Sequence, residues 1–315
     1  MQKIRTVLKI SFFFILNNVI KLKPLFVIFN FVFERSPYNL IVYFTRHIRI
    51  PNKNLNWKIK LYNNKIVKTR ILKNNPKTWQ FALSYKWHDR GLNMLETVLS
   101  EYFLENSIWI DCGANLGLRS LTPLSENIQV YMIEPNQETN SLCLERCELN
   151  NFKSYKILPY GVSNTDAKKS FYIDDSSYLS TLNNDILDDE NIKSINTIEV
   201  RKLDTIFSDK LNSNLNVFIK MDIEGHEIEA LEGAENLINS LSPSFVIEIN
   251  EKGSHLDLIF NKMRMKNYII YEVNDLINST CFLKLCVPGN SIYHRNDFLF
   301  VKDQKLNDYL KNYLI

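Results

Sequence analysis

The segment 107–117 constrains the fold more than any other part of the chain. It reads Ser-Ile-Trp-Ile-Asp-Cys-Gly-Ala-Asn-Leu-Gly, so a short apolar run leads from Ile108 through Asp111 into a turn that contains Gly113 and Gly117. Glycine allows tight backbone paths and the close approach of a ligand. A helix-like stretch follows. This order of strand, acidic glycine loop and helix is typical of a nucleotide-type site at the carboxyl ends of parallel strands.

A second carboxylate is expected at the same edge of the sheet. The next apolar run ends in Glu134, about 20 residues further on, where a carboxylate commonly holds ribose hydroxyls. The loop is G-x-x-x-G and not the dinucleotide pattern G-x-G-x-x-G. Asp111 would repel a pyrophosphate, whereas it would attract the sulfonium and ammonium groups of S-adenosylmethionine (SAM). The residues therefore favour SAM over NAD, and the alternative is a strand–turn–helix without a ligand.

Apolar runs alternate with helical stretches through most of the chain, which predicts an α/β fold. Such alternation indicates a Rossmann-like parallel sheet with helices on both faces. The late run 268–302 contains little helix and predicts an antiparallel pair at one edge. Residues 174–196 read as an irregular polar insertion. Strands are expected near 107–111, 129–134, 155–159, 217–222, 245–249, 268–273 and 298–302, and helices near 92–103, 137–150, 226–240 and 254–266.

The strand expected at 217–222 carries a second group of reactive side chains. Lys220 and Asp222 are two residues apart and share one face, and Glu224 and His226 follow in the next turn. Methyl transfer to a hydroxyl needs a base that takes the proton, and Asp222, Glu224 and His226 are the candidates. Lys220 could orient the acceptor or keep a carboxylate ionised. Glu248, which ends the following strand, is expected to bind the acceptor.

The same residues also have purely structural interpretations. Glu224 could stabilise the helix dipole, His226 could be solvated, and Lys220 could belong to a structural ion pair. Asn115 could donate its amide to SAM or could simply tolerate a left-handed backbone, and Asn136 has the same ambiguity.

Loop position places Gly161 and Val162 beside the adenine of the cofactor. No metal is predicted. Cys143 and Cys147 are four residues apart, but no second Cys or His pair completes a zinc site. The five cysteines are interpreted as free thiols of a reducing cytosol.

Several segments together resemble the FkbM family of SAM-dependent methyltransferases, in the order that the family has them. The resemblance covers about 90–302 and implies a seven-stranded methyltransferase sheet, SAM as cofactor and methyl transfer to a hydroxyl of a sugar or glycan. Cys112 departs from the family, in which an apolar residue is usual. The matching segments are 110–117 (IDCGANLG), 133–136 (IEPN), 160–164 (YGVSN), 200–204 (VRKLD), 219–227 (IKMDIEGHE), 231–234 (LEGA), 245–249 (FVIEI) and 297–301 (DFLFV).

The amino-terminal part differs in charge from the rest. Residues 1–88 contain 17 Lys or Arg and a single acid, Glu34, whereas the remainder is acidic overall. We expect an apolar, basic helical segment over 1–49, a small β-rich extension over 50–89 and the methyltransferase domain over 90–315. The apolar runs within 1–45 are too short to span a bilayer. They predict a cytoplasmic protein that attaches peripherally to an anionic inner membrane face, a position that would suit a lipid-linked acceptor. The alternative is packing on the core or on a second subunit of a homo-oligomer.

Other functions are less well supported. A basic arm would also suit nucleic-acid methylation, but the Asn/Asp-Pro-Pro-Tyr/Phe signature of amino-directed DNA methylation is absent from the sequence. Methylation of another small molecule is a further alternative. A non-catalytic membrane-associated adaptor with the same fold would predict loss of Asp111, Glu134 and Asp222, and all three are present.

Overall fold

The computed structural model describes residues 54–73, 78, 82, 85, 89–174, 180–183, 192–250, 253–275, 280–288 and 293–315. The predictions for residues 1–45 and for the segment 1–49 lie outside these ranges. The contacts of the chain group into two compact units, residues 1–90 and 91–315. Each unit is described by itself.

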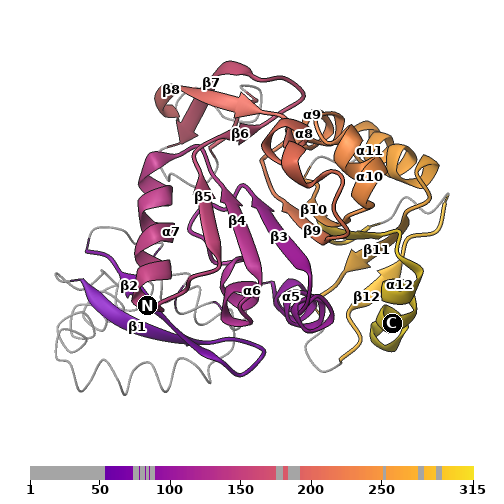
Figure 1. The fold of residues 1–315 in the computed structure, drawn as a ribbon, viewed down its shortest axis with the longest axis horizontal. Coiled ribbons are helices and arrows are strands. Elements are labelled where there is room, and N and C mark those ends of the chain that lie inside the picture. Colours follow the sequence, from indigo (N-terminus) through magenta and orange to yellow (C-terminus); the bar gives the residue numbers. More distant parts are fainter. Residues whose placement is uncertain are drawn as a thin grey trace, which may run out of the picture. The chain divides into compact units, whose positions relative to one another are not determined.

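The larger unit is built on an eight-stranded sheet with the order β12-β11-β13-β10-β9-β3-β4-β5 (Figure 1). Neighbouring strands from β10 to β5 run parallel, whereas β13 runs antiparallel to both β10 and β11. The predicted parallel sheet with an antiparallel edge is confirmed, and the short edge strand β12 adds one strand to the expected seven. The strands are β3 (Ser107–Cys112), β4 (Gln129–Ile133), β5 (Tyr155–Leu158), β9 (Asn216–Met221), β10 (Ser244–Glu248), β11 (Ile269–Val273), β12 (Leu283–Leu285) and β13 (Asp297–Val301).

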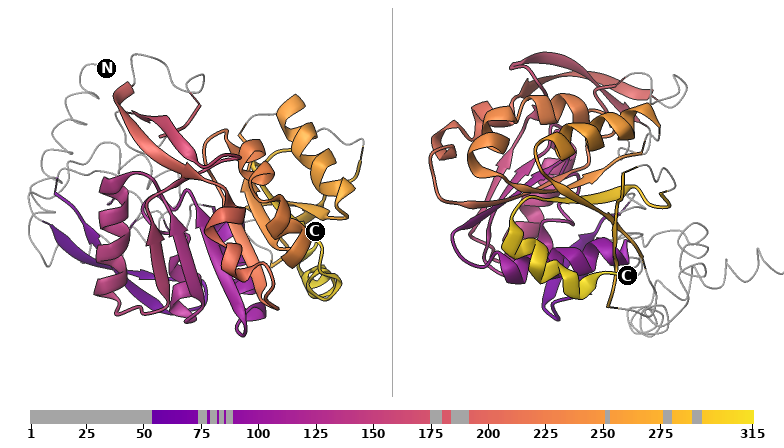
Figure 2. Two further views of the ribbon diagram at one scale, coloured as in Figure 1. Left: turned by 45° about the horizontal axis from the view of Figure 1, so that its top comes forward. Right: turned by 90° about the vertical axis from the view of Figure 1, so that its right-hand side faces the viewer.

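Helices cover both faces of this sheet, because apolar side chains alternate between its faces along each strand (Figure 2). Ile108 and Ile110 of β3 belong to one buried cluster, and Trp109 between them belongs to the other. The first cluster includes α8 (Leu203–Ile206), α9 (Glu227–Glu232), α10 (Glu235–Leu241) and α11 (Ser254–Met265). The second includes α5 (Arg90–Tyr102), α6 (Leu121–Ser125), α7 (Gln137–Leu149) and α12 (Gln304–Leu310).

A separate three-stranded sheet follows β5 in the chain and has the order β6-β8-β7. Its strands are β6 (Gly161–Val162), β7 (Ala167–Asp174) and β8 (Ile192–Arg201). The predicted irregular insertion over 174–196 is therefore wrong at its end, because β8 begins at Ile192 and pairs antiparallel with β7. Most of the side chains along β8 are only partly covered or exposed, so its sequence lacks the apolar run that marks a core strand.

The described part of the smaller unit contains a β-hairpin. Strand β1 (Leu55–Lys60) pairs antiparallel with β2 (Ile66–Ile71), and Asn64 takes a left-handed conformation in the turn between them, with φ of 65°. Both strands lie within the β-rich extension expected over 50–89. Within the described ranges, no helix combines the length and the apolar character that a membrane span requires.

Candidate active site

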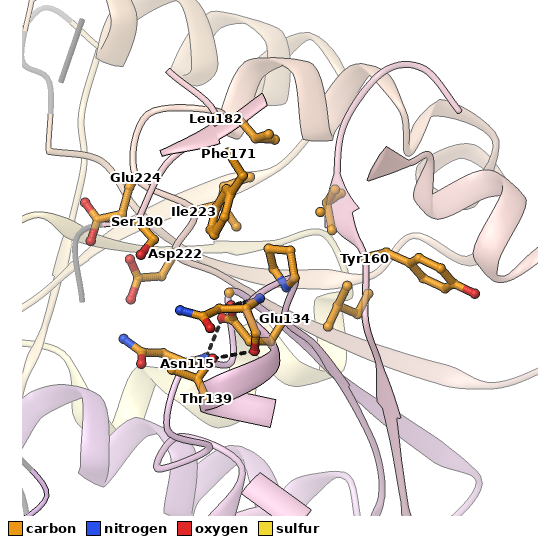
Figure 3. Close-up of a pocket in the computed structure, with 16 residues that line it drawn as sticks. Asn115, Glu134, Thr139, Tyr160, Phe171, Ser180, Leu182, Asp222, Ile223 and Glu224 are labelled. Carbon is orange, nitrogen blue, oxygen red and sulfur yellow. Dashed lines mark hydrogen bonds between the residues drawn. The ribbon is translucent and has the colours of Figure 1, made fainter. Parts of the chain in front are cut away.

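The topology creates a crevice at the carboxyl ends of the parallel strands. The chain runs from β3 outward to β4 and β5, and then returns to β9 on the other side of β3. Ligands of open α/β sheets bind at such a switch point. A pocket at this edge is lined by Gly113, Asn115, Ile133, Glu134, Pro135, Asn136, Thr139, Tyr160, Gly161, Val162, Phe171, Ser180, Leu182, Asp222, Ile223 and Glu224 (Figure 3).

The loop after β3 requires glycine at both predicted positions. Gly113 has φ of +75°, and a Cβ atom there would lie 1.9 Å from the carbonyl oxygen of Asp222. Gly117 has φ of +69°, and its Cβ atom would lie 2.9 Å from the sulfur of Cys143. The Cys143 thiol also donates to the carbonyl oxygen of Asn115 at 3.0 Å. The loop is thus pressed against β9 on one side and α7 on the other. Gly113 borders the pocket, whereas Gly117 lies behind it.

Glu134 is held at the centre of the pocket by the backbone (Figure 3). Its carboxylate accepts the backbone N–H of Asn115 at 2.9 Å and that of Asn136 at 2.8 Å. Burial raises the pKa of Glu134 to about 7, although these hydrogen bonds oppose the shift. The carboxylate is therefore fixed in orientation before any ligand binds, which is the property that a ribose-binding group needs.

The two asparagines have different roles. Asn136 is the N-cap of α7, because its side-chain oxygen accepts the N–H of Glu138 at 3.0 Å. Asn115 takes the left-handed conformation with φ of 48°, and its buried side-chain oxygen has no hydrogen-bond partner in the described part of the chain. Buried polar atoms are nearly always paired, so the Asn115 side chain suits a ligand that donates to it.

Asp111 does not line the pocket. It is fully buried within β3, accepts the hydroxyl of Ser120 at 2.7 Å and lies 4.0 Å from the ammonium of Lys220. Burial raises its pKa, and Lys220 works in the opposite direction. In this geometry Asp111 acts on the pocket through Lys220, and its predicted contact with the cofactor stays a prediction.

Lys220, which is buried, and the partly exposed Asp222 and Glu248 form one network at the ends of β9 and β10. The ammonium of Lys220 lies 2.8 Å from Asp222. Burial would raise the pKa of Asp222, but the ion pair with Lys220 and a hydrogen bond from Glu248 hold it below its usual range. The negative charge of Asp222, together with burial, raises the pKa of Glu248 to about 10. At neutral pH Asp222 is therefore ionised and Glu248 is protonated.

Glu224 differs from its neighbours because it reaches the pocket from a strained backbone. It has φ of 52°, a conformation that costs a non-glycine residue roughly 1–2 kcal/mol. Burial and the nearby charges of Asp222 and Glu227 raise its pKa to about 7. Its side chain has a long contact of 3.4 Å with the amide of Asn250. Glu224 is thus a carboxylate poised to exchange a proton near neutrality.

His226 is not brought into the pocket. Its Nε2 lies 3.0 Å from the hydroxyl of Ser163, and its Nδ1 lies 3.6 Å from Glu229. Burial lowers the pKa of His226, which favours the neutral ring. Of the three candidate bases, Asp222 and Glu224 line the pocket. His226 lies beside β6 instead.

Several lining residues were missed in the sequence. Phe171 lies on β7, and Ser180 and Leu182 lie on the segment 180–183 between β7 and β8. This segment is pinned to the site, because the hydroxyl of Thr181 donates to the carbonyl oxygen of Glu224 at 2.7 Å. No motif marks these positions, since the stretch read only as polar and irregular. Among the described residues, no group of three His, Cys, Asp or Glu side chains is arranged to hold a metal ion.

The sheet and the site together are those of a Rossmann-like, SAM-dependent methyltransferase. More specifically, the chain belongs to the FkbM methyltransferase family, because residues 111–270, about half of the chain, match the methyltransferase FkbM domain. No curated protein has a significant sequence match to this chain.

Three solved structures are similar to the chain. The methyltransferase FkbM from Methylobacillus flagellatus is 21% identical with a TM-score of 0.39, and the match covers 67% of this chain and 55% of that one. An rRNA methylase from Streptococcus thermophilus is 11% identical with a TM-score of 0.37, and the coverage is 67% and 94%. A Streptococcus mutans protein in complex with SAH is 11% identical with a TM-score of 0.37, and the coverage is 67% and 96%.

Proposed function

We propose that the protein is an O-methyltransferase that transfers the methyl group of SAM to a hydroxyl of a sugar or glycan. Membership of the FkbM family supports the reaction class and SAM as the cofactor. The sugar acceptor is inferred from the resemblance to that family. The observation that supports transfer to oxygen is the placement of Glu224, a carboxylate with a pKa of about 7, at the wall of the same pocket as Glu134.

One part of the pocket fits SAM. The Glu134 carboxylate would hold the ribose hydroxyls, and the unpartnered oxygen of Asn115 would accept from the cofactor. Gly113 lets the loop after β3 lie directly against the backbone of Asp222 at the pocket wall, where a Cβ atom would clash. Gly161 and Val162 line the same pocket and would contact the adenine. SAM, when bound, supplies an electrophilic methyl group.

The other part of the pocket fits a hydroxylated acceptor. Asp222 stays ionised beside Lys220, so it can accept a hydrogen bond but is a weak base. Glu224 has the higher proton affinity of the two and would take the proton from the reacting hydroxyl. Glu248 is protonated and would donate a hydrogen bond to Asp222. It would contact only the edge of the acceptor.

Ser180 would provide a further contact with the acceptor. Its hydroxyl is buried and has no hydrogen-bond partner among the described residues, and Figure 3 shows it between Glu224 and Asp222. Phe171 and Leu182 add apolar surface on the same side of the pocket. A ring with hydroxyls on its rim and C–H groups on its faces matches this combination of a polar edge and an apolar wall.

The proposal is tested by incubating the protein with methyl-labelled SAM and fractionated cell extract. We expect the label in the glycan or glycolipid fraction, and we expect base treatment to leave it in place, because methyl ethers resist hydrolysis and methyl esters do not. The matched control is Glu224→Gln, which keeps the shape of the side chain and should lose most of the labelling. Label confined to nucleic acid or protein would refute the sugar acceptor.

A further inference from the structure

The β1–β2 hairpin is strongly basic. Residues 54–73 contain six Lys or Arg and no Asp or Glu. None of these residues is among those that line the pocket described above.

Strand alternation gathers most of this charge on one face of the hairpin. Ile59, Val67, Thr69 and Ile71 are buried on the opposite face. We define the cationic face by the residues that the register places on its other side, which are Lys58, Lys60, Ile66, Lys68 and Arg70.

Two features of the pairing on the cationic face stand out. Lys58 lies directly opposite Lys68, and like charges at directly opposed positions destabilise an antiparallel pair. Lys60 lies opposite Ile66, whose side chain is 64% exposed at the end of β2 beside the turn. Folding alone gives no reason to leave a large aliphatic side chain exposed at the tip.

The mixture of lysines with an exposed isoleucine indicates the chemistry of the partner. Lysines near an anionic lipid surface contribute roughly 1 kcal/mol each, and an aliphatic side chain gains by entering the boundary between headgroups and acyl chains. Tyr62, which is partly buried, lies in the turn that follows β1, and tyrosine is enriched at membrane interfaces. A nucleic acid would neutralise the lysines but would leave Ile66 without an apolar environment.

We propose that the cationic face of the β1–β2 hairpin binds the surface of an anionic lipid bilayer, with Ile66 directed into the interface. This attachment is separate from the one predicted for residues 1–45, because it rests on a different segment. It is also independent of the proposed sugar acceptor, since it does not involve the methyl-transfer pocket.

The test uses the full chain and vesicles of phosphatidylserine mixed with phosphatidylcholine, at low salt. The variant Lys58→Gln/Lys60→Gln/Lys68→Gln should bind roughly 100-fold more weakly than the native chain, because three lysine contacts are removed. The matched control is Lys153→Gln/Lys193→Gln/Lys305→Gln, which removes the same charge from exposed positions of the larger unit and should bind within severalfold of the native chain. Ile66→Ser should weaken binding by a similar factor at low and at high salt, because it removes an apolar contact that salt does not screen.

Thermal unfolding separates this role from a structural one. If the lysines serve binding, the hairpin variant should keep the melting temperature of the native chain, whereas a hairpin that needs its lysines for folding would melt earlier. The proposal is overturned if the hairpin variant and the control variant bind vesicles equally. It is also overturned if the native chain binds single-stranded nucleic acid but not the anionic vesicles.

Discussion

Three carboxyl groups at the mouth of β9 and β10 have different protonation states because their neighbours differ. Asp222 has Lys220 at 2.8 Å and stays charged. Glu248 has the charge of Asp222 beside it and keeps its proton, with a pKa of about 10. Glu224 has no cation in direct contact among the ion pairs of the described residues, and its pKa is about 7. Environments that separate the pKa values of neighbouring acids assign them to different tasks.

The first prediction concerns the pH dependence of this site. If Glu224 is the base, only its deprotonated form is active, so the rate should rise with pH through about 7 and level off above it. Glu224→Gln should lower kcat by roughly 10²–10⁴ and should abolish the pH-dependent limb. The measurement is the initial rate of methyl transfer between acidic and mildly alkaline pH, with SAM at saturation.

Glu248→Gln is the matched control for this prediction. Glu248 is already protonated at neutral pH, so an amide should replace it with only a small effect on kcat. Equal losses in Glu224→Gln and Glu248→Gln would contradict the assignment of the base. If Glu224→Gln kept the rise of rate with pH, another group would be the one that titrates, and Glu134 would be the first candidate.

At the scale of elements, α10 depends on a side chain from another helix. Its N-cap, Ala234, makes no side-chain hydrogen bond. Asp204 of α8 accepts the N–H groups of Leu237 at 2.8 Å and of Asn236 at 3.0 Å instead. Segment 200–204, which resembles the family, therefore has a structural role at Asp204. This side chain accepts N–H groups in the first turn of α10, a helix that packs against the sheet.

A second prediction follows for Asp204. Asp204→Ala leaves two helix N–H groups without acceptors and should destabilise the fold by about 0.5–2 kcal/mol. SAM affinity below the unfolding transition should be unchanged. Denaturant unfolding and calorimetric SAM titration measure the two quantities. Asp204→Asn retains one acceptor oxygen and should lie between the native chain and the alanine variant, and a loss of SAM affinity without a loss of stability would contradict this role.

Elements with continuous apolar runs could be predicted from the sequence, whereas those shaped by tertiary contacts could not. The strand around 217–222 was clear because both of its faces are buried. The single helix expected over 226–240 is instead divided into α9 and α10. The division falls at Gly233, where a Cβ atom would lie 2.0 Å from the carbonyl oxygen of Ser163. That approach comes from β6 and leaves no local signal in the helix.

At the scale of the whole molecule, the sheet topology explains which site residues could be predicted. Gly113, Glu134, Asp222 and Glu224 follow strands that are distant in sequence, and the parallel order brings their ends to one edge. Ser180 was not predictable, because its place depends on how β7 and β8 lie over that edge. The position of His226 beside Ser163 has the same origin.

The contact of the first loop with Cys143 has a consequence for the kinetics of the protein. The Cys143 thiol lies beneath Gly117 and donates to Asn115, and burial raises its pKa. An alkylating reagent can react with this sulfur only while the loop is displaced from it. The rate of alkylation therefore reports how often the loop opens. Bound SAM should hold the loop closed and should therefore lower the alkylation rate of Cys143. Cys147 lies one turn further along α7 and is equally buried, but no hydrogen bond joins it to the loop within the described part of the chain. SAM should therefore leave its modification rate almost unchanged, which peptide mass spectrometry would measure.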